Sequence, residues 1–446
     1  MDMRTRNPFP ADFHDYINTD EGWVDRRIFW EEAIYQQELE KIFARSWHFI
    51  AHDSQVPNTG DFITTYMGED GVVASRHSDG QVYVYLNSCP HRGNKICFAD
   101  SGTSRSFNCN YHGWSFSTKG ELLGIHNEQT YDEGDINKAD WGLRNARVET
   151  YKGLIFANFD VDAPDLESWL GDYRWFLDML IDNEEGGIEF LPGTIKSYVN
   201  ANWKFGVENF IGDSLHALWS HDSGAKAMMD NQPFPPAVLE DSFHASMNGH
   251  GWEFGTDGYA DIAILGQPEV LEYYQQIKPK MAERLGELRS KIFGSLASAS
   301  LFPNISFLAG LGTFRVWLPR GPRKMELRIW TIVNKNMPDE IKQAINRGTM
   351  LTFAPGGTLE MDDGENWEGN TNTNRGIVTR QEKLHYGCGI SRRIDHEEIP
   401  GIVYHGQYND ANQLAFYQRW ADMMNADSWA DIPERYSPRY AGKPTR

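Results

Sequence analysis

Apolar residues recur at steps of three and four in several parts of the chain, which places them on one face of an α-helix. The clearest case is 165–182, where leucine and aromatic residues form one continuous stripe. The periodicity therefore predicts helices over the segments 31–45, 165–182, 337–350 and 409–425, and a long helical stretch within 268–298.

A different pattern fills the region between the first two of these helices. Short runs rich in valine, isoleucine and tyrosine alternate there with clusters of glycine, asparagine, aspartate and serine, as in a small all-β domain. Strands are predicted at 71–76, 81–86 and 152–159, and antiparallel strands in the C-terminal half at 304–309, 312–318 and 325–333. The predicted architecture is a β-rich domain followed by an α+β domain, with the boundary just before residue 165.

Length, charge and cysteine content narrow the class of protein. A chain of 446 residues is long enough for two domains. Its net charge of −21 argues against nucleic acid or an anionic membrane as the main partner. Four cysteines are too few for a disulfide scaffold, and no apolar run approaches the roughly 20 residues that span a bilayer. We therefore expect a cytoplasmic protein.

Two short segments each combine one cysteine with one histidine. His91 follows Cys89 by two residues, and 17 residues separate His91 from Cys109. His112 follows Cys109 by three residues. A structural zinc finger usually takes two cysteines from one arm and two histidines from the other. A Rieske [2Fe–2S] centre binds one iron through two cysteines and the other through two histidines, so each arm must reach both metals. The mixed arms favour a Rieske centre, with zinc as the alternative.

A second group of candidate ligands lies at 208–221. Asn209, Asp213 and His216 are spaced by four and three residues, so a helix would place them on one face. His221 follows His216 by five residues, so both imidazoles can meet one metal only if the helix ends or carries a π-type irregularity between them. Two histidines and one carboxylate form the facial triad of non-haem Fe(II) oxygenases. The alternative is two ordinary core or surface histidines.

The carboxylate of such a triad has to come from elsewhere in the chain. An acidic cluster at 359–367 follows a Pro-Gly-Gly turn and offers four carboxylates, those of Glu360, Asp362, Asp363 and Glu365. Spacing does not choose among them. The alternative is that this cluster is a solvated loop.

These features together resemble the α subunit of Rieske non-haem iron aromatic-ring-hydroxylating oxygenases, and the resemblance covers nearly the whole chain. It is strongest to the group that acts on naphthalene, biphenyl and polycyclic aromatics. The segments that carry it include 60–66, 202–204, 208–213 and 362–366. The resemblance implies that the cluster ligands are Cys89, His91, Cys109 and His112. It implies that His216, His221 and Asp363 bind the mononuclear iron.

The same resemblance implies a fold and a domain organisation. The expected class is α+β, with a Rieske β-sandwich domain inserted ahead of a helix-grip catalytic domain that contains a large antiparallel sheet. The expected domains are an N-terminal helical segment (1–45) that packs with the catalytic domain, the Rieske domain (46–164) and the catalytic mononuclear iron domain (165–446).

The implied activity is that of a terminal oxygenase, which uses O₂ and electrons from an NADH-linked reductase and ferredoxin to form a cis-dihydrodiol. NADH is expected to act through the reductase, because no Gly-x-Gly-x-x-Gly occurs in a strand–turn–helix context. The alternatives are a Rieske monooxygenase for a carboxylated or substituted aromatic and, from another class, a Rieske electron-transfer protein without oxygenase activity.

The resemblance also implies an assembly. The family's α subunits form rings of three, usually with a small β subunit as α₃β₃. Asp213 would then bridge His112 of one subunit and His216 of the next. Four basic residues near the cysteine–histidine loops are expected to form a docking patch for an acidic ferredoxin: Arg92, Lys95, Arg105 and Lys119.

By position, six residues resemble those that line the family's substrate pocket: Asn209, Phe210, Ser214, Asn304, Phe353 and Leu359. Their mainly apolar character suits a flat aromatic hydrocarbon. The alternative is that Phe210 and Phe353 simply belong to the core. A carboxylated substrate would call for a basic residue in the pocket, and sequence alone assigns none.

Overall fold

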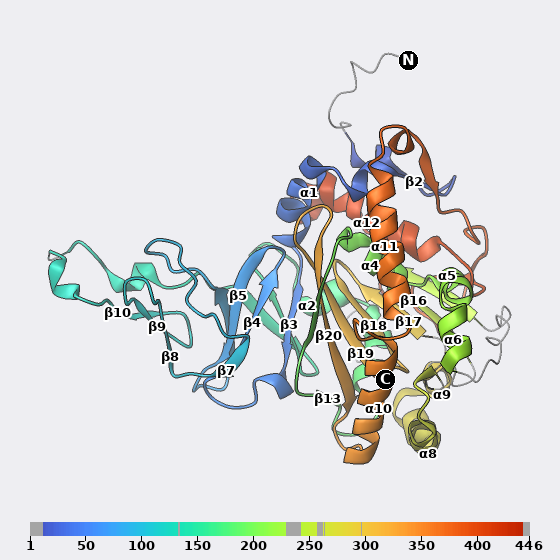
Figure 1. The fold of residues 1–446 in the computed structure, drawn as a ribbon, viewed down its shortest axis with the longest axis horizontal. Coiled ribbons are helices and arrows are strands. Elements are labelled where there is room, and N and C mark those ends of the chain that lie inside the picture. Colours follow the sequence, from blue (N-terminus) through green and yellow to red (C-terminus); the bar gives the residue numbers. More distant parts are fainter. Residues whose placement is uncertain are drawn as a thin grey trace. The chain divides into compact units, whose positions relative to one another are not determined.

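The computed structural model describes residues 12–132, 134–228, 242–256, 262, 264–295 and 297–439 (Figure 1). Contacts between residues divide the chain into two units. The large unit comprises Met1–Ile42 with Leu170–Arg446, and the small unit comprises Phe43–Trp169. Within the described residues, no helix is long and apolar enough to cross a membrane.

The small unit is a β-sandwich with a second, smaller core beside it. A four-stranded sheet of order β6-β5-β4-β7 packs its apolar face against β3 and β12 of a three-stranded sheet of order β11-β12-β3. The third sheet, of order β10-β9-β8, contributes to a separate core that also contains the two candidate cysteines, Cys89 and Cys109.

The strands of the small unit are β3 (His48–His52), β4 (Asp61–Met67), β5 (Asp70–Arg76), β6 (Val82–Leu86), β7 (Ser101–Thr103), β8 (Ser106–Asn108), β9 (Ser115–Ser117), β10 (Leu122–Gly124), β11 (Arg147–Tyr151) and β12 (Leu154–Asn158). Its short helices are η4 (Asp53–Gln55), η5 (Glu128–Thr130) and η6 (Lys138–Trp141), and α2 (Leu166–Leu170) lies at its boundary.

The large unit is built on an antiparallel sheet that has ten strands among the described residues. The strand order is β13-β20-β19-β18-β17-β16-β15-β23-β22, and β14 also pairs with β20. Strands β16, β18, β19 and β20 are buried along their whole length. Because successive side chains point to opposite faces of a sheet, such strands are covered on both faces.

The strands of this sheet are β13 (Ile188–Phe190), β14 (Ile195–Val199), β15 (Ser242–Met247), β16 (His250–Gly255), β17 (Ala297–Leu301), β18 (Ile305–Leu308), β19 (Thr313–Pro319), β20 (Met325–Asn334), β22 (Arg393–Ile394) and β23 (Ile402–His405). A small second sheet contains β1 (Ile17–Asn18), β2 (Trp23–Asp25) and β21 (Lys383–His385).

The helices of the large unit are α1 (Glu32–Glu38), α3 (Tyr173–Ile181), α4 (Trp203–Phe210), α5 (Ser214–Ser220), α6 (Asp222–Met228), α8 (Pro268–Leu285), α9 (Glu287–Ile292), α10 (Asp339–Thr352), α11 (Glu360–Asn374) and α12 (Ala411–Asn425). A π-helical turn, η3 (Leu39–Phe43), follows α1. The short 3₁₀ helices are η1 (Phe13–Tyr16), η2 (Arg26–Phe29), η7 (Thr379–Gln381) and η8 (Trp429–Asp431).

The α+β class with a large antiparallel sheet is confirmed, and β18, β19, β20, α10 and α12 lie where the sequence predicted them. The helix predicted at 165–182 is wrong as a single element, whereas the long helical stretch predicted within 268–298 is confirmed by α8. Gly171, with φ of 51°, separates α2 from α3, and Gly286, with φ of 93°, separates α8 from α9. The segment that ends at residue 298 also turns into β17 at Ala297. The alternative of a solvated loop at 359–367 is wrong, because helix α11 begins at Glu360.

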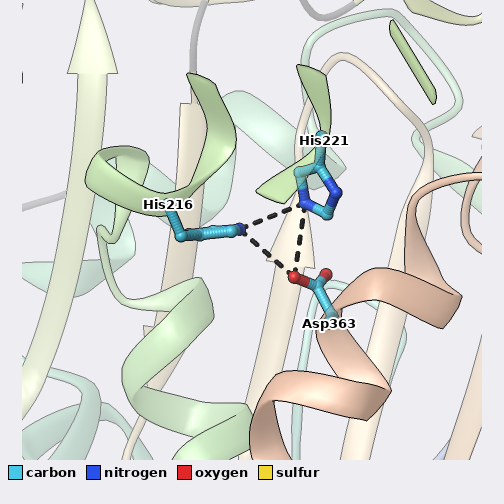
Figure 2. A group of neighbouring side chains, drawn as sticks. All are labelled: His216, His221 and Asp363. Carbon is cyan, nitrogen blue, oxygen red and sulfur yellow. Dashed lines mark hydrogen bonds and ion pairs between the residues drawn. The ribbon is translucent and has the colours of Figure 1, made fainter. Parts of the chain in front are cut away.

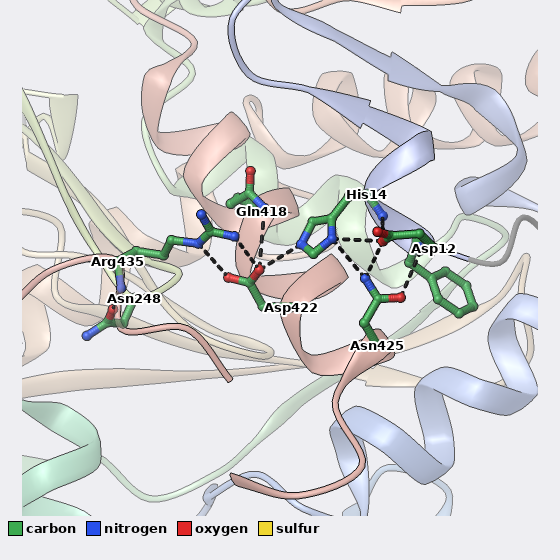
Figure 3. Close-up of polar contacts among 8 residues, drawn as sticks. Asp12, His14, Asn248, Gln418, Asp422, Asn425 and Arg435 are labelled. Carbon is green, nitrogen blue, oxygen red and sulfur yellow. Dashed lines mark hydrogen bonds and ion pairs between the residues drawn. The ribbon is translucent and has the colours of Figure 1, made fainter. Parts of the chain in front are cut away.

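Helix α12 holds segments from opposite ends of the described sequence through polar contacts (Figure 3). The Nε2 atom of His14 lies 2.8 Å from Oδ1 of Asp422, whose side chain is fully buried. Arg435 donates to the same carboxylate at 2.7 Å. The side-chain oxygen of Asn425 accepts the N–H of Phe13 at 2.8 Å. These contacts fix α12 at its C-terminal end.

At its other end, α12 stabilises the last turn of α4. The side-chain amide of Asn412 donates to the carbonyl of Ile211 at 2.8 Å, and that of Gln413 donates to the carbonyl of Glu208 at 3.3 Å. The last carbonyls of a helix have no partner within it, so these amides satisfy groups that would otherwise be left open. The end of α4 is thereby fixed just before the segment that carries the candidate histidines.

Candidate metal centres

The two cysteine–histidine loops of the small unit share one backbone pattern. In the first, the N–H of Cys89 donates to the carbonyl five residues later, and its own carbonyl accepts the N–H of Gly93, both at 2.8 Å. In the second, Cys109 makes the same two bonds at 2.8 and 3.0 Å, the latter from Gly113. Gly93 and Gly113 have φ of 76° and 72°. Such angles favour glycine, so these residues allow the tight turns.

The side chains of these loops suit a Rieske cluster. Both cysteines are buried, and the rings of His91 and His112 lie 4.5 Å apart between centroids. Nδ1 of His91 is buried and has no hydrogen-bond partner among the residues that the structure describes. A buried imidazole nitrogen without a partner is expected where that nitrogen binds a metal. The ring of His91 also stacks on Trp114 at 5.0 Å, which fixes its orientation.

Backbone N–H groups donate hydrogen bonds to the sulfur atoms of both cysteines, and these bonds act to lower the pKa of each thiol. The N–H groups of His91 and Arg92 face the sulfur of Cys89, although burial still raises the pKa of that thiol. Burial would also raise the pKa of Cys109, but hydrogen bonds from the backbone of Tyr111 and from other groups lower it. Donors of this kind stabilise thiolates, which are the form of cysteine that binds iron.

In the large unit, His216, His221 and Asp363 each point one ligand atom at a common position, and these atoms all lie within 4.8 Å of one another (Figure 2). Oδ1 of Asp363 lies 3.2 Å from Nε2 of His216 and 3.3 Å from Nε2 of His221. The two Nε2 atoms are 3.2 Å apart. Two imidazoles and one carboxylate on one side of a metal leave other coordination positions open.

A break between α4 and α5 brings the two histidines to this position. Helix α4 ends at Phe210, Asp213 is the N-cap of α5, and Gly212 between them has φ of 139°. The prediction that Asn209, Asp213 and His216 share one face of a single helix is therefore wrong. Helix α5 ends at Ser220, which is one of the two arrangements predicted to let His221 turn back toward His216.

Each candidate histidine has its other ring nitrogen near a carboxylate. Nδ1 of His216 lies 3.4 Å from Oδ2 of Asp213, and Nδ1 of His221 lies 3.3 Å from Oδ2 of Asp362. Carboxylates in this position fix the tautomer and the ring orientation of metal-binding histidines. Sequence reasoning treated Asp362 only as a competitor of Asp363, whereas the structure gives the two aspartates different neighbours.

The neighbouring charges shift the pKa values of the candidate ligands Asp363 and His216. Burial alone would raise the pKa of Asp363, but hydrogen bonds with His216 and His221 lower it to about 2. Burial alone would lower the pKa of His216, but Asp213 and Asp363 raise it well above its usual value. The carboxylate is therefore ionised at neutral pH and available to a cation.

The first turn of α11 gives its acidic residues separate partners. Glu360 accepts a hydrogen bond from Nη1 of Arg315 at 2.6 Å, Asp362 faces His221, and Asp363 faces both histidines. Glu365 is exposed. Negative side chains are favoured in the first turn of a helix, where the N–H groups are unpaired. Of the four carboxylates that spacing left open, only Asp363 joins the group formed with both histidines among the described residues.

Three of the six residues predicted at the substrate pocket lie close to the site: Asn209 lies near His216, and the rings of Phe210 and Phe353 contact each other. The side-chain nitrogen of Asn209 lies 3.1 Å from Nδ1 of His216, and the rings of Phe210 and Phe353 lie 6.4 Å apart. The others are buried in separate contacts: Ser214 donates to Glu253, Asn304 donates to the carbonyl of Trp317 at 2.9 Å, and Leu359 is the N-cap of α11. Their role in substrate binding stays a prediction.

The four residues of the predicted basic patch in the small unit differ in exposure and in partners. Arg92 and Arg105 are exposed, and Nζ of Lys95 lies 5.6 Å from the ring centroid of Phe98. Lys119 instead forms an ion pair with Asp79 at 3.0 Å. Its charge is therefore partly neutralised.

Comparisons with known proteins agree with this arrangement. The family model described as "Rieske [2Fe-2S] domain" matches residues 46–151, and "Ring hydroxylating alpha subunit (catalytic domain)" matches residues 166–426. The chain is 40% identical over 431 residues to the biphenyl 2,3-dioxygenase subunit alpha of Rhodococcus jostii, covering 95% of this chain and 93% of the relative. It is 39% identical over 417 residues to a benzene 1,2-dioxygenase subunit alpha of Pseudomonas putida, covering 92% of each.

A solved structure extends the similarity to the fold. The crystal structure of a naphthalene 1,2-dioxygenase mutant bound to phenanthrene superposes with a TM-score of 0.89 at 30% identity, over 95% of this chain and 97% of that one. Family models thus match most of the chain, and relatives and a solved structure match nearly all of it. The chain therefore belongs to the α subunits of the Rieske-type aromatic-ring-hydroxylating dioxygenases, the terminal oxygenase components of multi-component enzymes.

Proposed function

We propose that the seven candidate ligands hold the two metal centres of this oxygenase. The [2Fe–2S] cluster would be bound by Cys89, His91, Cys109 and His112, and the mononuclear Fe(II) by His216, His221 and Asp363. The observation that carries the second assignment is the convergence of three ligand atoms within 4.8 Å. We assign the Rieske function to 46–164 and the catalytic function to 165–446, with 1–45 packing on the latter.

The reaction we propose is dihydroxylation of an aromatic ring. One arene, one O₂, two electrons and two protons give one cis-dihydrodiol, so all atoms and electrons balance. When bound, the cluster would pass on electrons that originate from NADH in partner proteins, and the mononuclear iron would activate O₂. Asp213 and Asp362 would hold the protons on the Nδ1 atoms of the two histidines, which leaves the Nε2 lone pairs available for the metal.

Asp213 is the residue that we propose to connect the two centres across an α₃β₃ assembly. One of its oxygens faces Nδ1 of His216, and its side chain is 34% exposed. It can therefore accept a second hydrogen bond from another chain. In the proposed assembly, that donor is His112 of the partner subunit.

The substrate that we favour is an apolar aromatic hydrocarbon of the kind named in the similar proteins, such as benzene, biphenyl or naphthalene. Phe210 and Phe353, which lie side by side, would contact it. The buried cation beside these rings, Arg315, is already paired with Glu360. A substrate carboxylate would have to compete with Glu360, which argues against the carboxylated aromatics.

The assignment can be tested by product analysis of the reconstituted system. The purified chain with its small subunit, a ferredoxin and an NADH-dependent reductase is given benzene, biphenyl, naphthalene or benzoate under ¹⁸O₂. We expect cis-dihydrodiols that carry two ¹⁸O atoms from the hydrocarbons and little turnover of benzoate. Singly labelled phenols as the first products would show a monooxygenase instead.

Metal analysis separates the oxygenase from a Rieske electron carrier. An oxygenase with both centres loaded should contain about three irons per chain, and an electron carrier about two. We expect the reaction to take place in the cytoplasm, where NADH is available to the reductase.

A further inference from the structure

A buried arginine lies where three helices of the large unit end or begin. Arg315 on β19 has a fully buried side chain, and its Nη1 donates to Oε2 of Glu360 at 2.6 Å. Its Cζ lies 4.2 Å from the ring centroid of Phe210 and 5.0 Å from that of Phe353. Phe210 is the last residue of α4, Phe353 is the C-cap of α10 and Glu360 is the first residue of α11.

Two of these contacts lead directly to the metal site. Glu360 precedes Asp363 by three residues in α11, so the two carboxylates are neighbours on one side of the helix. Asn209, the residue before Phe210, lies 3.1 Å from Nδ1 of His216. The guanidinium of Arg315 therefore touches both segments that bring side chains to the candidate ligands.

The contacts of Arg315 are unusual for a residue whose role is only to pack the core. Its Nε and Nη2 atoms and Oε1 of Glu360 are buried, and none has a hydrogen-bond partner among the described residues. Burial of an ion pair costs desolvation energy, and apolar residues of similar size often stabilise a fold equally well or better. What an arginine adds is direction, because its planar group fixes the carboxylate that it binds and stacks on aromatic rings.

We propose that Arg315 is a positioning residue of the mononuclear metal site. By holding Glu360 and the ring of Phe210, it sets the rotation of the first turn of α11 and so the direction from which Asp363 meets the metal. Arg315 itself does not touch the metal or the reacting atoms. The inference rests on the metal ligands proposed above.

The test measures metal binding rather than turnover. The full chain, stripped of mononuclear iron with its cluster intact, is titrated with Co²⁺, and both the dissociation constant and the ligand-field absorption spectrum are recorded. Arg315→Met should weaken Co²⁺ binding about tenfold and change the spectrum, as loss of an outer contact does in other metal sites. Arg315→Lys should recover part of the affinity, because it keeps a cation for Glu360.

A double variant separates positioning from stability. Arg315→Met combined with Glu360→Met removes both buried charges, so its unfolding temperature should return toward that of the wild type. Its Co²⁺ affinity should stay low, because the directional contact is still missing. If affinity returns together with stability, the pair is only structural and the inference is overturned.

A matched control is the buried pair on the neighbouring strand. Arg328 on β20 donates to Glu326 at 2.7 Å, and Arg328→Met should lower stability but leave the Co²⁺ constant and spectrum unchanged. Equal weakening by Arg328→Met, or wild-type binding by Arg315→Met, would overturn the inference. A wild-type chain that binds no Co²⁺ at the histidines would instead contradict the proposed ligands.

Discussion

In the small unit, four candidate ligands lie on two loops that close their own backbone hydrogen bonds. In the large unit, by contrast, His216 lies in helix α5, His221 is the C-cap of α5, and Asp363 lies in α11, far away in sequence. The loops repeat one pattern of bonds around Cys89 and Cys109. In the large unit, His221 and its neighbour Asp362 are 141 residues apart in sequence. The first centre is organised locally, and the second depends on how distant elements pack.

This difference predicts different sensitivities to substitution. A local loop keeps its geometry as long as its own turns are kept, so few residues outside it should matter. The site formed by α5 and α11 depends on more distant contacts. These are the break before α5, the carboxylates of Asp213 and Asp362 beside the histidines, and the buried ion pair of Arg315 with Glu360. Five predictions, from the largest expected effect to the smallest, test this contrast.

The largest effects should come from the ligands themselves. His221→Ala should remove the mononuclear iron and turnover while the Rieske absorption spectrum stays intact, because the two sets of ligands belong to different units. Cys109→Ala should bleach the cluster and leave the mononuclear iron in place. Iron content and visible absorption measure both. Loss of both metals in either variant would show that the units do not fold independently.

Asp213→Asn should break the proposed connection between the centres without emptying either. The exchange is nearly isosteric, but it removes the charge and replaces one acceptor oxygen by a donor amide. The cluster should still be reduced by its donor, and its reoxidation on adding substrate and O₂ should slow roughly 100-fold, as measured by single-turnover stopped-flow. Because Asp213 also faces Nδ1 of His216, the variant is loaded with excess iron before the measurement. Reoxidation at the wild-type rate in the loaded variant would exclude the bridging role, and failure to load even with excess iron would make Asp213 a structural residue.

Asp362→Asn should weaken iron binding at the dispersed site without changing a ligand. The carboxylate behind His221 would lose its charge, which typically costs about 10- to 100-fold in metal affinity. Glu365→Gln, on the exposed side of the same helix, is the matched control and should bind iron as the wild type does. Equal affinity in all three proteins would mean that Asp362 does not support His221.

Glu208→Gln should alter the pH dependence of folding in the large unit. The hydroxyl groups of Tyr386 and Tyr417 donate to Glu208, and burial raises its pKa from 4.5 to about 8, with Asp213 and Asp410 acting in the same direction. Between these values the unfolded chain releases a proton that the folded chain keeps. Wild-type stability should therefore fall as pH rises from 4.5 to about 8.

Glutamine has no proton to release, so the stability of the variant should not depend on pH through this position. The unfolding constant of the wild type should therefore rise, relative to that of the variant, by about tenfold per pH unit in this range. Urea unfolding at pH 5 and pH 7.5 measures the difference. A gap between the two proteins that does not change with pH would contradict the raised pKa.

The smallest effects should come from the surface of the small unit. Arg92→Ala and Arg105→Ala should slow electron transfer from an acidic ferredoxin a few-fold at low salt, because both side chains are exposed. The difference should fade at high salt, where the Debye length falls below about 8 Å. Lys119→Ala should have less effect, since the ion pair with Asp79 already partly neutralises that charge. Rates that do not respond to salt would exclude electrostatic docking.

The same contrast explains how much of each centre could be predicted from sequence. The cysteine–histidine loops were visible because ligand spacing within a few residues reflects their geometry directly. Spacing could not decide which carboxylate of α11 is a ligand, because that depends on which side chains of β19 and α5 contact each carboxylate. The family resemblance named Asp363, and spacing alone could not.

Helix α11 shows why its structure was also missed. Its buried residues Glu360, Asp363, Trp367, Thr371 and Asn374 do follow a helical period. Most are polar, however, so a search for apolar periodicity does not detect them. The opposite error occurred at 165–182, where apolar spacing continues across Gly171 although the backbone turns there.

Gly212, in the break between α4 and α5, has a consequence for mutational scanning and library design. A Cβ at this position would lie 2.9 Å from Nδ1 of His244 and 3.0 Å from Cβ of Glu253, and its φ of 139° is unfavourable for other residues. A scan scored by activity would thus rank Gly212 with the metal ligands, although it carries no reactive atom. Libraries aimed at new substrates should keep this position fixed and place their diversity elsewhere.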